Sequence, residues 1–199
     1  MSKHHIHPLL LETIKIEGGE IYNLNYHQRR CDYSRKKLFN ISKSLKLEKI
    51  IQAPLKGLFR CRIIYAQEVH SVEYIPYIEK DIQTLKIVSS NLNYTFKYAN
   101  RDRLDTLLAI HKNVDEVIIE KGGLLTDTTI SNLAFFNGTQ WFTPESPLLK
   151  GTMRQKLLDD GFLQTKNIKK DDLSEYTQVA LINAMLGFKI LKNIKLEDL

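Results

Sequence analysis

Apolar and polar residues alternate in short runs that are typical of β-strands joined by tight hairpins. The runs meet at Gly-Gly or Asn-Gly pairs, which supply the positive φ angles that short hairpin turns need. These pairs are Gly18-Gly19, Gly122-Gly123 and Asn137-Gly138. Further strands are expected over residues 59–65, 72–77 and 86–88. Antiparallel sheet is therefore predicted in both halves of the chain.

Between the hairpins, apolar residues recur at helical spacing. Helices are expected over residues 26–41, 103–111, 152–160 and 174–189. Strand runs and helical runs are mixed without the strict βαβ alternation of a doubly wound fold, which indicates the α+β class. A break near residues 79–84 predicts an N-terminal α+β lobe of residues 1–81 and a C-terminal α+β lobe of residues 82–199.

Composition places the chain among ordinary folded proteins. It has 199 residues, of which 43% are hydrophobic and 26% charged, and this balance argues against intrinsic disorder. No apolar run approaches the roughly 20 residues of a membrane span, and the N-terminus lacks the apolar segment of a secretory signal. Cys31 and Cys61 form no disulfide framework, which fits a reducing compartment. We therefore expect a cytoplasmic protein without membrane association.

The formal charge of +6 is a mild excess. Basic residues are interleaved with acidic ones, for example over residues 43–49 and 166–172, which favours a solvated face over a stripe that binds nucleic acid. A modestly positive protein suits an anionic ligand such as a phosphate or a carboxylate. The expected partner is therefore a small molecule rather than nucleic acid.

Several familiar site types are absent from the sequence. It contains no P-loop, no GxGxxG, no GxSxG and no HExxH motif. His4, His5 and His7 could bind a metal ion, but an N-terminal tail is the favoured interpretation. No metal site is expected.

Five motifs remain, and they follow one another in a fixed order. The first is Leu11-Glu12-Thr13, and the second is an H-x-x-R that ends at Arg30. The third is Lys97 followed by Asn100, the fourth is Asp127 followed by Asn132-Leu133, and the last is a G-x-M-R over residues 151–154. Each motif alone is weak, but five in register are specific. Together they resemble the class IV aminotransferases, also called fold-type IV pyridoxal-phosphate enzymes.

The resemblance runs from about residue 11 to residue 188 and implies a fold, a cofactor and an assembly. The implied fold is the two-lobed fold of D-amino-acid aminotransferase-like enzymes, with antiparallel sheets and flanking helices. The implied cofactor is pyridoxal 5′-phosphate, and the implied assembly is a homodimer. Family members usually carry a longer segment before the Leu-Glu-Thr strand. We therefore expect a short variant with a more open substrate pocket.

The resemblance also assigns roles to individual residues. Lys97 would bind the aldehyde of the cofactor and act as acid–base catalyst, Asp127 would hold the pyridine nitrogen where the family has Glu, and Arg30 would bind the phosphate. The backbone of the loop at the start of the last predicted motif would bind the phosphate as well, through Gly151, Thr152 and Met153. The alternatives are a surface lysine, an aspartate that caps a turn and a surface arginine.

Local details favour one branch of the family, aminodeoxychorismate lyase. Lys97-Tyr98-x-Asn100-Arg101, the G-x-M-R-Q over residues 151–155 and the N-A-x-x-G that starts at Asn183 are similar to the lyase forms. The implied reaction eliminates pyruvate from 4-amino-4-deoxychorismate and leaves 4-aminobenzoate for folate synthesis. Asn183 and Arg60 are candidate substrate contacts, although Arg60 and Arg62 would equally suit a solvated basic face.

Two other functions stay open. One is a class IV aminotransferase that acts on a D-amino acid or a branched-chain amino acid. The other is a non-catalytic relative that keeps the fold without the chemistry, because a fold alone does not establish a function.

Overall fold

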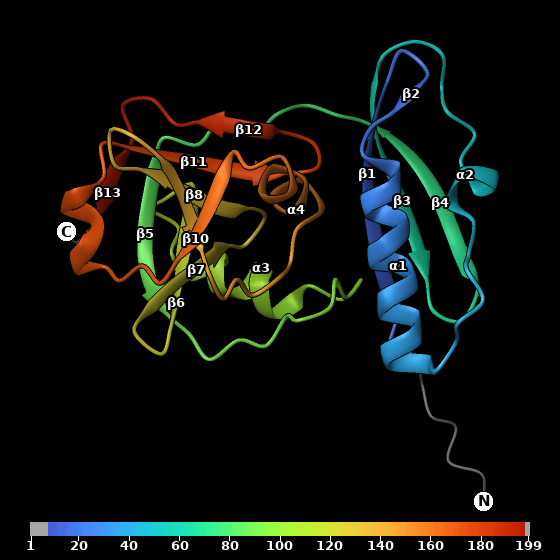
Figure 1. The fold of residues 1–199 in the computed structure, drawn as a ribbon, viewed down its shortest axis with the longest axis horizontal. Coiled ribbons are helices and arrows are strands. Elements are labelled where there is room, and N and C mark those ends of the chain that lie inside the picture. Colours follow the sequence, from blue (N-terminus) through green and yellow to red (C-terminus); the bar gives the residue numbers. More distant parts are fainter. Residues whose placement is uncertain (1–7, 198–199) are drawn as a thin grey trace, which may run out of the picture. The chain divides into compact units, whose positions relative to one another are not determined.

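The computed structural model describes residues 8–197 and divides the chain into two compact units (Figure 1). The first unit extends to Tyr77 and also contains Phe96–Asn100, and the second contains Ile78–Thr95 and Arg101–Leu199. The sequence placed the division at residues 81 and 82 and assigned residues 96–100 to the second lobe. This segment belongs to the first unit because its main chain pairs with strand β1 (Leu10–Glu17), where the Leu11 amide donates to the Lys97 carbonyl at 2.8 Å.

The first unit is an antiparallel sheet with a helix packed on one face. Its strands have the order β2-β1-β3-β4, where β2 is Glu20–Ile21, β3 is Leu58–Tyr65 and β4 is Val69–Pro76. Gly18 and Gly19, with φ of 58° and 86°, form the two-residue turn between β1 and β2. Positive φ at both positions is the geometry that Gly-Gly permits. Helix α1 (Leu24–Phe39) and the short helix α2 (Leu47–Ile50) follow.

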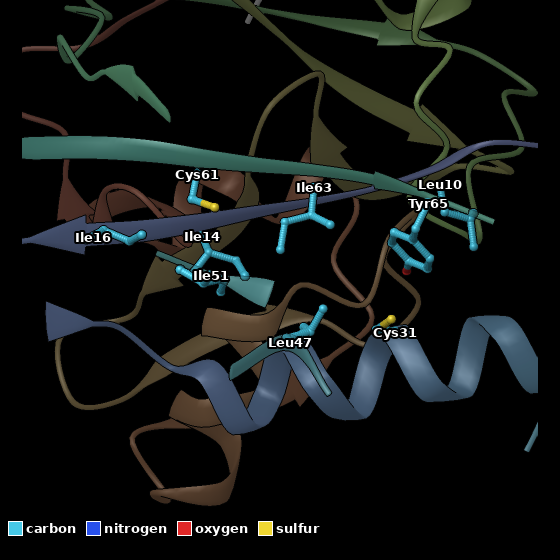
Figure 2. Packing of buried hydrophobic residues seen from close by; sticks show 9 residues of the cluster. All are labelled: Leu10, Ile14, Ile16, Cys31, Leu47, Ile51, Cys61, Ile63 and Tyr65. Carbon is cyan, nitrogen blue, oxygen red and sulfur yellow. The ribbon is translucent and has the colours of Figure 1, made fainter. Parts of the chain in front are cut away.

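The core of the first unit lies between α1 and the sheet. Figure 2 shows alternate residues of β1 and β3 pointing at the helix, together with Cys31 of α1 and Leu47 and Ile51 from the following segment. The strand members of this cluster are Leu10, Ile14, Ile16, Cys61, Ile63 and Tyr65. Period-two alternation also turns Glu12 toward the helix, where its exposed fraction is 0%.

A buried arginine attaches α1 to two loops. Arg35 donates from Nη1 to the Lys43 carbonyl at 2.5 Å and from Nη2 to the Gln67 carbonyl at 2.6 Å. The guanidinium therefore joins the segment after α1 and the turn between β3 and β4 to the helix.

In the described residues, the second unit is a nine-stranded mixed sheet with two α-helices. The main path of strands is β10-β9-β8-β7-β6-β5-β13, while β11 pairs with both β8 and β12. The strands of the path are β5 (Thr84–Ser89), β6 (Glu116–Lys121), β7 (Leu124–Thr128), β8 (Asn132–Phe136), β9 (Trp141–Pro144), β10 (Leu163–Lys166) and β13 (Lys195–Glu197). Helix α3 (Asp102–Ala109) connects the parallel strands β5 and β6, and α4 (Thr152–Asp159) connects the parallel strands β9 and β10.

The α+β class, the three hairpins and the first three helices expected from sequence are confirmed. The helix expected over residues 174–189 is wrong. That segment forms a 3₁₀ turn η1 (Asp171–Glu175) and the antiparallel strands β11 (Gln178–Asn183) and β12 (Gly187–Ile190). A short apolar run fits a strand and a helix equally well, and here pairing of β11 with β8 decides in favour of the strand.

Two apolar clusters fill the second unit. One joins Leu85, Ile118, Leu133 and Leu181 from four strands, and the other packs Trp141 and its neighbours beneath α4. Within residues 8–197, no helix is long and apolar enough to cross a membrane.

Candidate functional site

In the first unit, a carboxylate at the centre of β1 binds two side chains of α1. Glu12 Oε2 accepts a hydrogen bond from His27 Nδ1 at 2.6 Å. Arg30 forms a bidentate ion pair with Glu12, in which Nε donates to Oε1 at 2.9 Å and Nη2 donates to Oε2 at 2.6 Å. Glu12 and His27 are fully buried, and the Arg30 side chain is 13% exposed. The H-x-x-R motif therefore binds a carboxylate of its own chain.

The charges in this cluster follow from its burial. Burial alone would raise the pKa of Glu12, but the charge of Arg30 and the hydrogen bonds from His27 and Arg30 lower it to about 2. Burial lowers the pKa of His27, which opposes its attraction to Glu12. Glu12 is therefore ionised and His27 is neutral, and the His27 proton lies on Nδ1 because an ionised carboxylate can only accept.

Lys97 lies at the apex of a three-residue turn beside β1. The Tyr98 amide donates to the Phe96 carbonyl at 2.9 Å, and the Lys97 carbonyl accepts from Leu11. The Phe96 ring stacks on Tyr33 of α1 with centroids 6.2 Å apart. The charge of Lys97 contributes to the lowered pKa of His27, as does the charge of Arg30. Lys97 and Arg30 therefore both lie close enough to His27 in the first unit for their charges to affect it.

Arg60 lies on the sheet face opposite α1, as strand alternation requires. It pairs in register with Lys15 of β1, and Arg62 follows it on the same face. Arg62 donates to Glu73 at 3.1 Å, and Lys15 lies 2.8 Å from Glu17. Among residues 8–197, no acceptor reaches the buried Arg60 Nε. Arg60 thus differs from its two basic neighbours, which have carboxylate partners.

In the second unit, Asp127 and Asn132 face each other across β7 and β8. They are the only register pair between these strands in the described part of the chain. Asn132 Nδ2 donates to Asp127 Oδ1 at 2.7 Å and to the Leu149 carbonyl at 2.8 Å. The Leu149 amide donates to Asp127 Oδ2 at 2.8 Å. Asp127 is therefore held by the loop that leads into α4.

Gly151 is the N-cap residue of α4, and glycine is required there because a side chain would not fit. Its φ of −69° suits any residue, but a Cβ at this position would overlap Asn132 Oδ1. The backbone of the loop thus comes close to Asn132, and Thr152 and Met153 begin the helix directly after it. The structure thus places the loop that ends at Gly151 against Asn132 and Asp127, while the phosphate contacts expected of Gly151, Thr152 and Met153 stay a prediction.

Other motif residues have structural partners. Arg154 is buried and donates from Nη2 to the Pro144 carbonyl at 2.8 Å, which attaches α4 to β9. Asn183 Oδ1 accepts from the amides of Met185 and Leu186, and its Nδ2 donates to Ser131 Oγ at 2.9 Å. Asn183, a candidate substrate contact, thus shapes the turn between β11 and β12.

Asp127 has an unusual charge state for a carboxyl group. Burial raises its pKa to about 7, although hydrogen bonds from the Leu149 amide and Asn132 oppose the rise. The charge of the buried Arg154 opposes the rise as well, although the two side chains form no ion pair within residues 8–197. Because burial outweighs these contributions, the site suits an added cationic group such as a protonated pyridine.

Each unit contains residues that fit a part of pyridoxal phosphate. Asp127 can accept from the pyridine nitrogen, and the backbone at Gly151 is close-packed and opens an eight-residue helix, which suits an anion. Lys97 and Arg30 supply an amine and a guanidinium in the first unit.

Three residues that matter here were not assigned a role from sequence. Glu12 was part of a motif, and its inward position follows from period two beside Leu10 and Ile14. Asn132 was also part of a motif, but its two partners are visible only in the structure. Glu116 gave no sequence signal. It is fully buried, accepts from the Thr129 hydroxyl at 2.8 Å and holds the turn between β7 and β8.

Residues 8–197 contain no group of three or more His, Cys, Asp and Glu arranged to hold a metal ion. His4, His5 and His7 lie outside the described residues.

Comparisons with known proteins agree on one family. The sequence model of the amino-transferase class IV family matches residues 9–194. An uncharacterised protein of Haemophilus influenzae is 38% identical over 184 residues, which cover 89% of this chain and 98% of that protein. A Schizosaccharomyces pombe protein, provisionally named an aminodeoxychorismate lyase, is 37% identical over 78 residues, which are 37% of this chain and 34% of that protein.

Solved structures show the same fold. A Haemophilus somnus protein, provisionally named a 4-amino-4-deoxychorismate lyase, has a TM-score of 0.82 and 37% identity, over 94% of this chain and 99% of that one. A hypothetical aminotransferase of Mycobacterium tuberculosis in its PLP-bound form has a TM-score of 0.78 and 15% identity, over 99% and 86% of the two chains. The two-lobed fold-type IV architecture expected from sequence is confirmed.

The charge state of Asp127 predicts a pH dependence of stability without added cofactor. The folded protein keeps a proton on Asp127 up to about pH 7, whereas the unfolded chain loses it near 3.8, so stability falls as the pH rises through this window. Asp127→Asn removes the titration. Urea unfolding at pH 5 and pH 8 should show wild type losing roughly 2–3 kcal/mol relative to the variant. Parallel pH profiles would contradict the assignment.

Proposed function

Because the chain belongs to the class IV aminotransferase family, we propose that it is a pyridoxal-phosphate enzyme that eliminates pyruvate from 4-amino-4-deoxychorismate, leaving 4-aminobenzoate for folate synthesis. The observation that carries the cofactor assignment is Asp127, a buried carboxyl group without an ion-pair partner in the described residues, held against the loop at Gly151. Membership of the family and the arrangement in each unit support the proposal from independent directions.

Each unit contributes its own residues to the proposed chemistry. Lys97 of the first unit would hold the aldehyde of the cofactor, and its amine would take up and return protons during the reaction. Arg30 would donate hydrogen bonds to the phosphate. When bound, pyridoxal phosphate supplies an electron sink for bond cleavage on the substrate.

The second unit also contributes residues to the proposal. Asp127 would accept from the pyridine nitrogen, and a cation beside it would favour its ionised form. Gly151, Thr152 and Met153 present backbone donors at the start of α4. Asp is one methylene shorter than the Glu of the family, and the Leu149 amide and Asn132 determine where its carboxylate lies.

The lyase is favoured over an aminotransferase by sequence details and by relatives. Lys97-Tyr98-x-Asn100-Arg101 and the G-x-M-R-Q that begins at Gly151 have the lyase form. The Haemophilus somnus relative bears the provisional lyase name at 37% identity. We place the activity in the cytoplasm because two free cysteines suit a reducing compartment.

Lys97 provides the direct test. Wild type with pyridoxal phosphate should turn yellow and convert aminodeoxychorismate to 4-aminobenzoate and pyruvate, whereas Lys97→Ala should lose the colour and lower turnover at least about 1,000-fold. Lys36→Ala, on the exposed surface of α1, is the matched control and should change neither.

The other outcomes of this experiment separate the alternatives. A yellow protein that forms no 4-aminobenzoate rejects the lyase. Exchange of an amino group between a D- or branched-chain amino acid and a 2-oxoacid would then favour the aminotransferase. A protein that stays colourless with excess cofactor favours a non-catalytic relative.

Arg60 is the proposed anchor for a substrate carboxylate, because its buried Nε has no acceptor among residues 8–197. Asn183 is not proposed for this contact, since its amide is used by the turn that it forms. Arg60→Gln should raise the KM about tenfold or more at nearly unchanged kcat, as expected for a charge-assisted hydrogen bond. Arg62→Gln, which removes a cation already paired with Glu73, should change the KM less than about twofold. Equal effects of the two variants would reject the anchor.

The proposed assembly is a homodimer, as in other members of the family. Light scattering should give twice the chain mass of 23.1 kDa at micromolar concentration. A monomer mass that persists with cofactor bound would contradict the dimer.

A further inference from the structure

Glu12 is the most enclosed ionised group of the first unit, and the proposed chemistry gives it no step. Its two oxygens accept three hydrogen bonds, one from His27 and two from Arg30. All three lie between 2.6 and 2.9 Å, and Glu12 has an exposed fraction of 0%. Such a carboxylate is an internal partner and does not contact solvent.

An acid–base role for Glu12 is inconsistent with its surroundings. Arg30 and His27 lower its pKa to about 2, so it is ionised at neutral pH and neither takes up nor releases a proton there. His27 is neutral and uses its Nδ1 proton for Glu12. What the cluster does impose is geometry, because two parallel N–H bonds to one carboxylate fix the plane of the Arg30 guanidinium.

We propose that Glu12 is a positioning residue, which holds the Arg30 guanidinium in the orientation that binds the cofactor's phosphate and so gives the protein its preference for pyridoxal phosphate over pyridoxal. The inference rests on the proposed function, and in particular on pyridoxal phosphate as the cofactor. It assigns the preference to the orientation of one guanidinium group.

Glu12 preorganises Arg30 for its ligand. A free arginine side chain loses rotamer entropy when a ligand fixes it, which weakens binding. Glu12 fixes Arg30 before any ligand arrives, and α1 carries both Arg30 and the His27 that steadies the carboxylate. The Arg30 side chain keeps 13% of its surface exposed, whereas Glu12 and His27 keep none. Arg30 is therefore the member of the cluster that solvent, and hence a ligand, can reach.

Charge alone predicts the opposite effect of removing Glu12. The ionised carboxylate neutralises Arg30, so a purely electrostatic view expects phosphate to bind more tightly once Glu12 is uncharged. Positioning expects phosphate to bind more weakly, because the guanidinium loses its fixed plane. The sign of the change distinguishes the two accounts.

The experiment measures dissociation constants of pyridoxal phosphate and pyridoxal by absorbance titration. Glu12→Gln should weaken pyridoxal phosphate about tenfold or more and change pyridoxal less than about threefold. Glu73→Gln is the matched control, because it removes the carboxylate of another Glu–Arg pair in the same sheet, and it should change neither constant. Tighter binding of pyridoxal phosphate, or equal weakening of both aldehydes, would overturn the inference.

Arg30→Lys is a second variant, and it decides the question even if Glu12→Gln does not fold. Lysine keeps the positive charge but lacks the planar fork that pairs with a carboxylate. The preference for the phosphorylated aldehyde should fall about tenfold in this variant as well. A preference that survives in Arg30→Lys would show that charge suffices and would refute positioning.

The outcomes also separate this inference from the proposed function. If wild type binds neither aldehyde, the cofactor assignment fails and the inference fails with it. If wild type prefers pyridoxal phosphate and both variants keep that preference, only the role of Glu12 is refuted.

Discussion

Burial of a carboxylate is the constraint on which both units depend. An ionised carboxyl group is strongly disfavoured away from water unless the protein supplies donors and a counter-charge. Glu12 and Asp127 are each almost wholly enclosed, with exposed fractions of 0% and 4%. The two carboxyl groups have different partners and different pKa values, and this difference indicates what kind of ligand each unit suits.

The first unit supplies everything that its carboxylate needs. Glu12 has a guanidinium and an imidazole from α1, and its pKa falls to about 2. The second unit supplies hydrogen bonds and the charge of Arg154, but no ion pair within the described residues, and burial still raises the pKa of Asp127 to about 7. Glu12 already has a paired counter-charge, whereas an added cation beside Asp127 would stabilise its ionised form. A cofactor with a protonated ring nitrogen provides that cation.

Many motif residues form hydrogen bonds with backbone groups and so hold loops and turns in place. Arg154 ties α4 to β9, and Asn183 closes the turn after β11. Asn132 joins Asp127 to the loop before α4, which approaches so closely that Gly151 has no room for a side chain. A motif that marks a binding family can therefore consist largely of residues that shape the loops, with few that touch the ligand.

Local chemistry was readable from the sequence, because it depends on neighbours along the chain. Gly18-Gly19 and Gly122-Gly123 can adopt positive φ whatever surrounds them, so the hairpins were predicted correctly. The motif spacing likewise identified the family and the candidate residues. Partners distant in sequence were a different matter. The helix expected over residues 174–189 is wrong because β11 has a strand partner, β8, about 45 residues earlier in the chain.

Only the tertiary structure decided which charged side chains have partners and which protonation states burial favours. The return of Phe96–Asn100 to β1, the pairing of Glu12 with Arg30 and the burial that raises the pKa of Asp127 all depend on segments distant in sequence. A linear pattern can show that these residues are present and in which order. Burial and the distance between side chains give them their charge states, and both arise only when segments remote in sequence pack together.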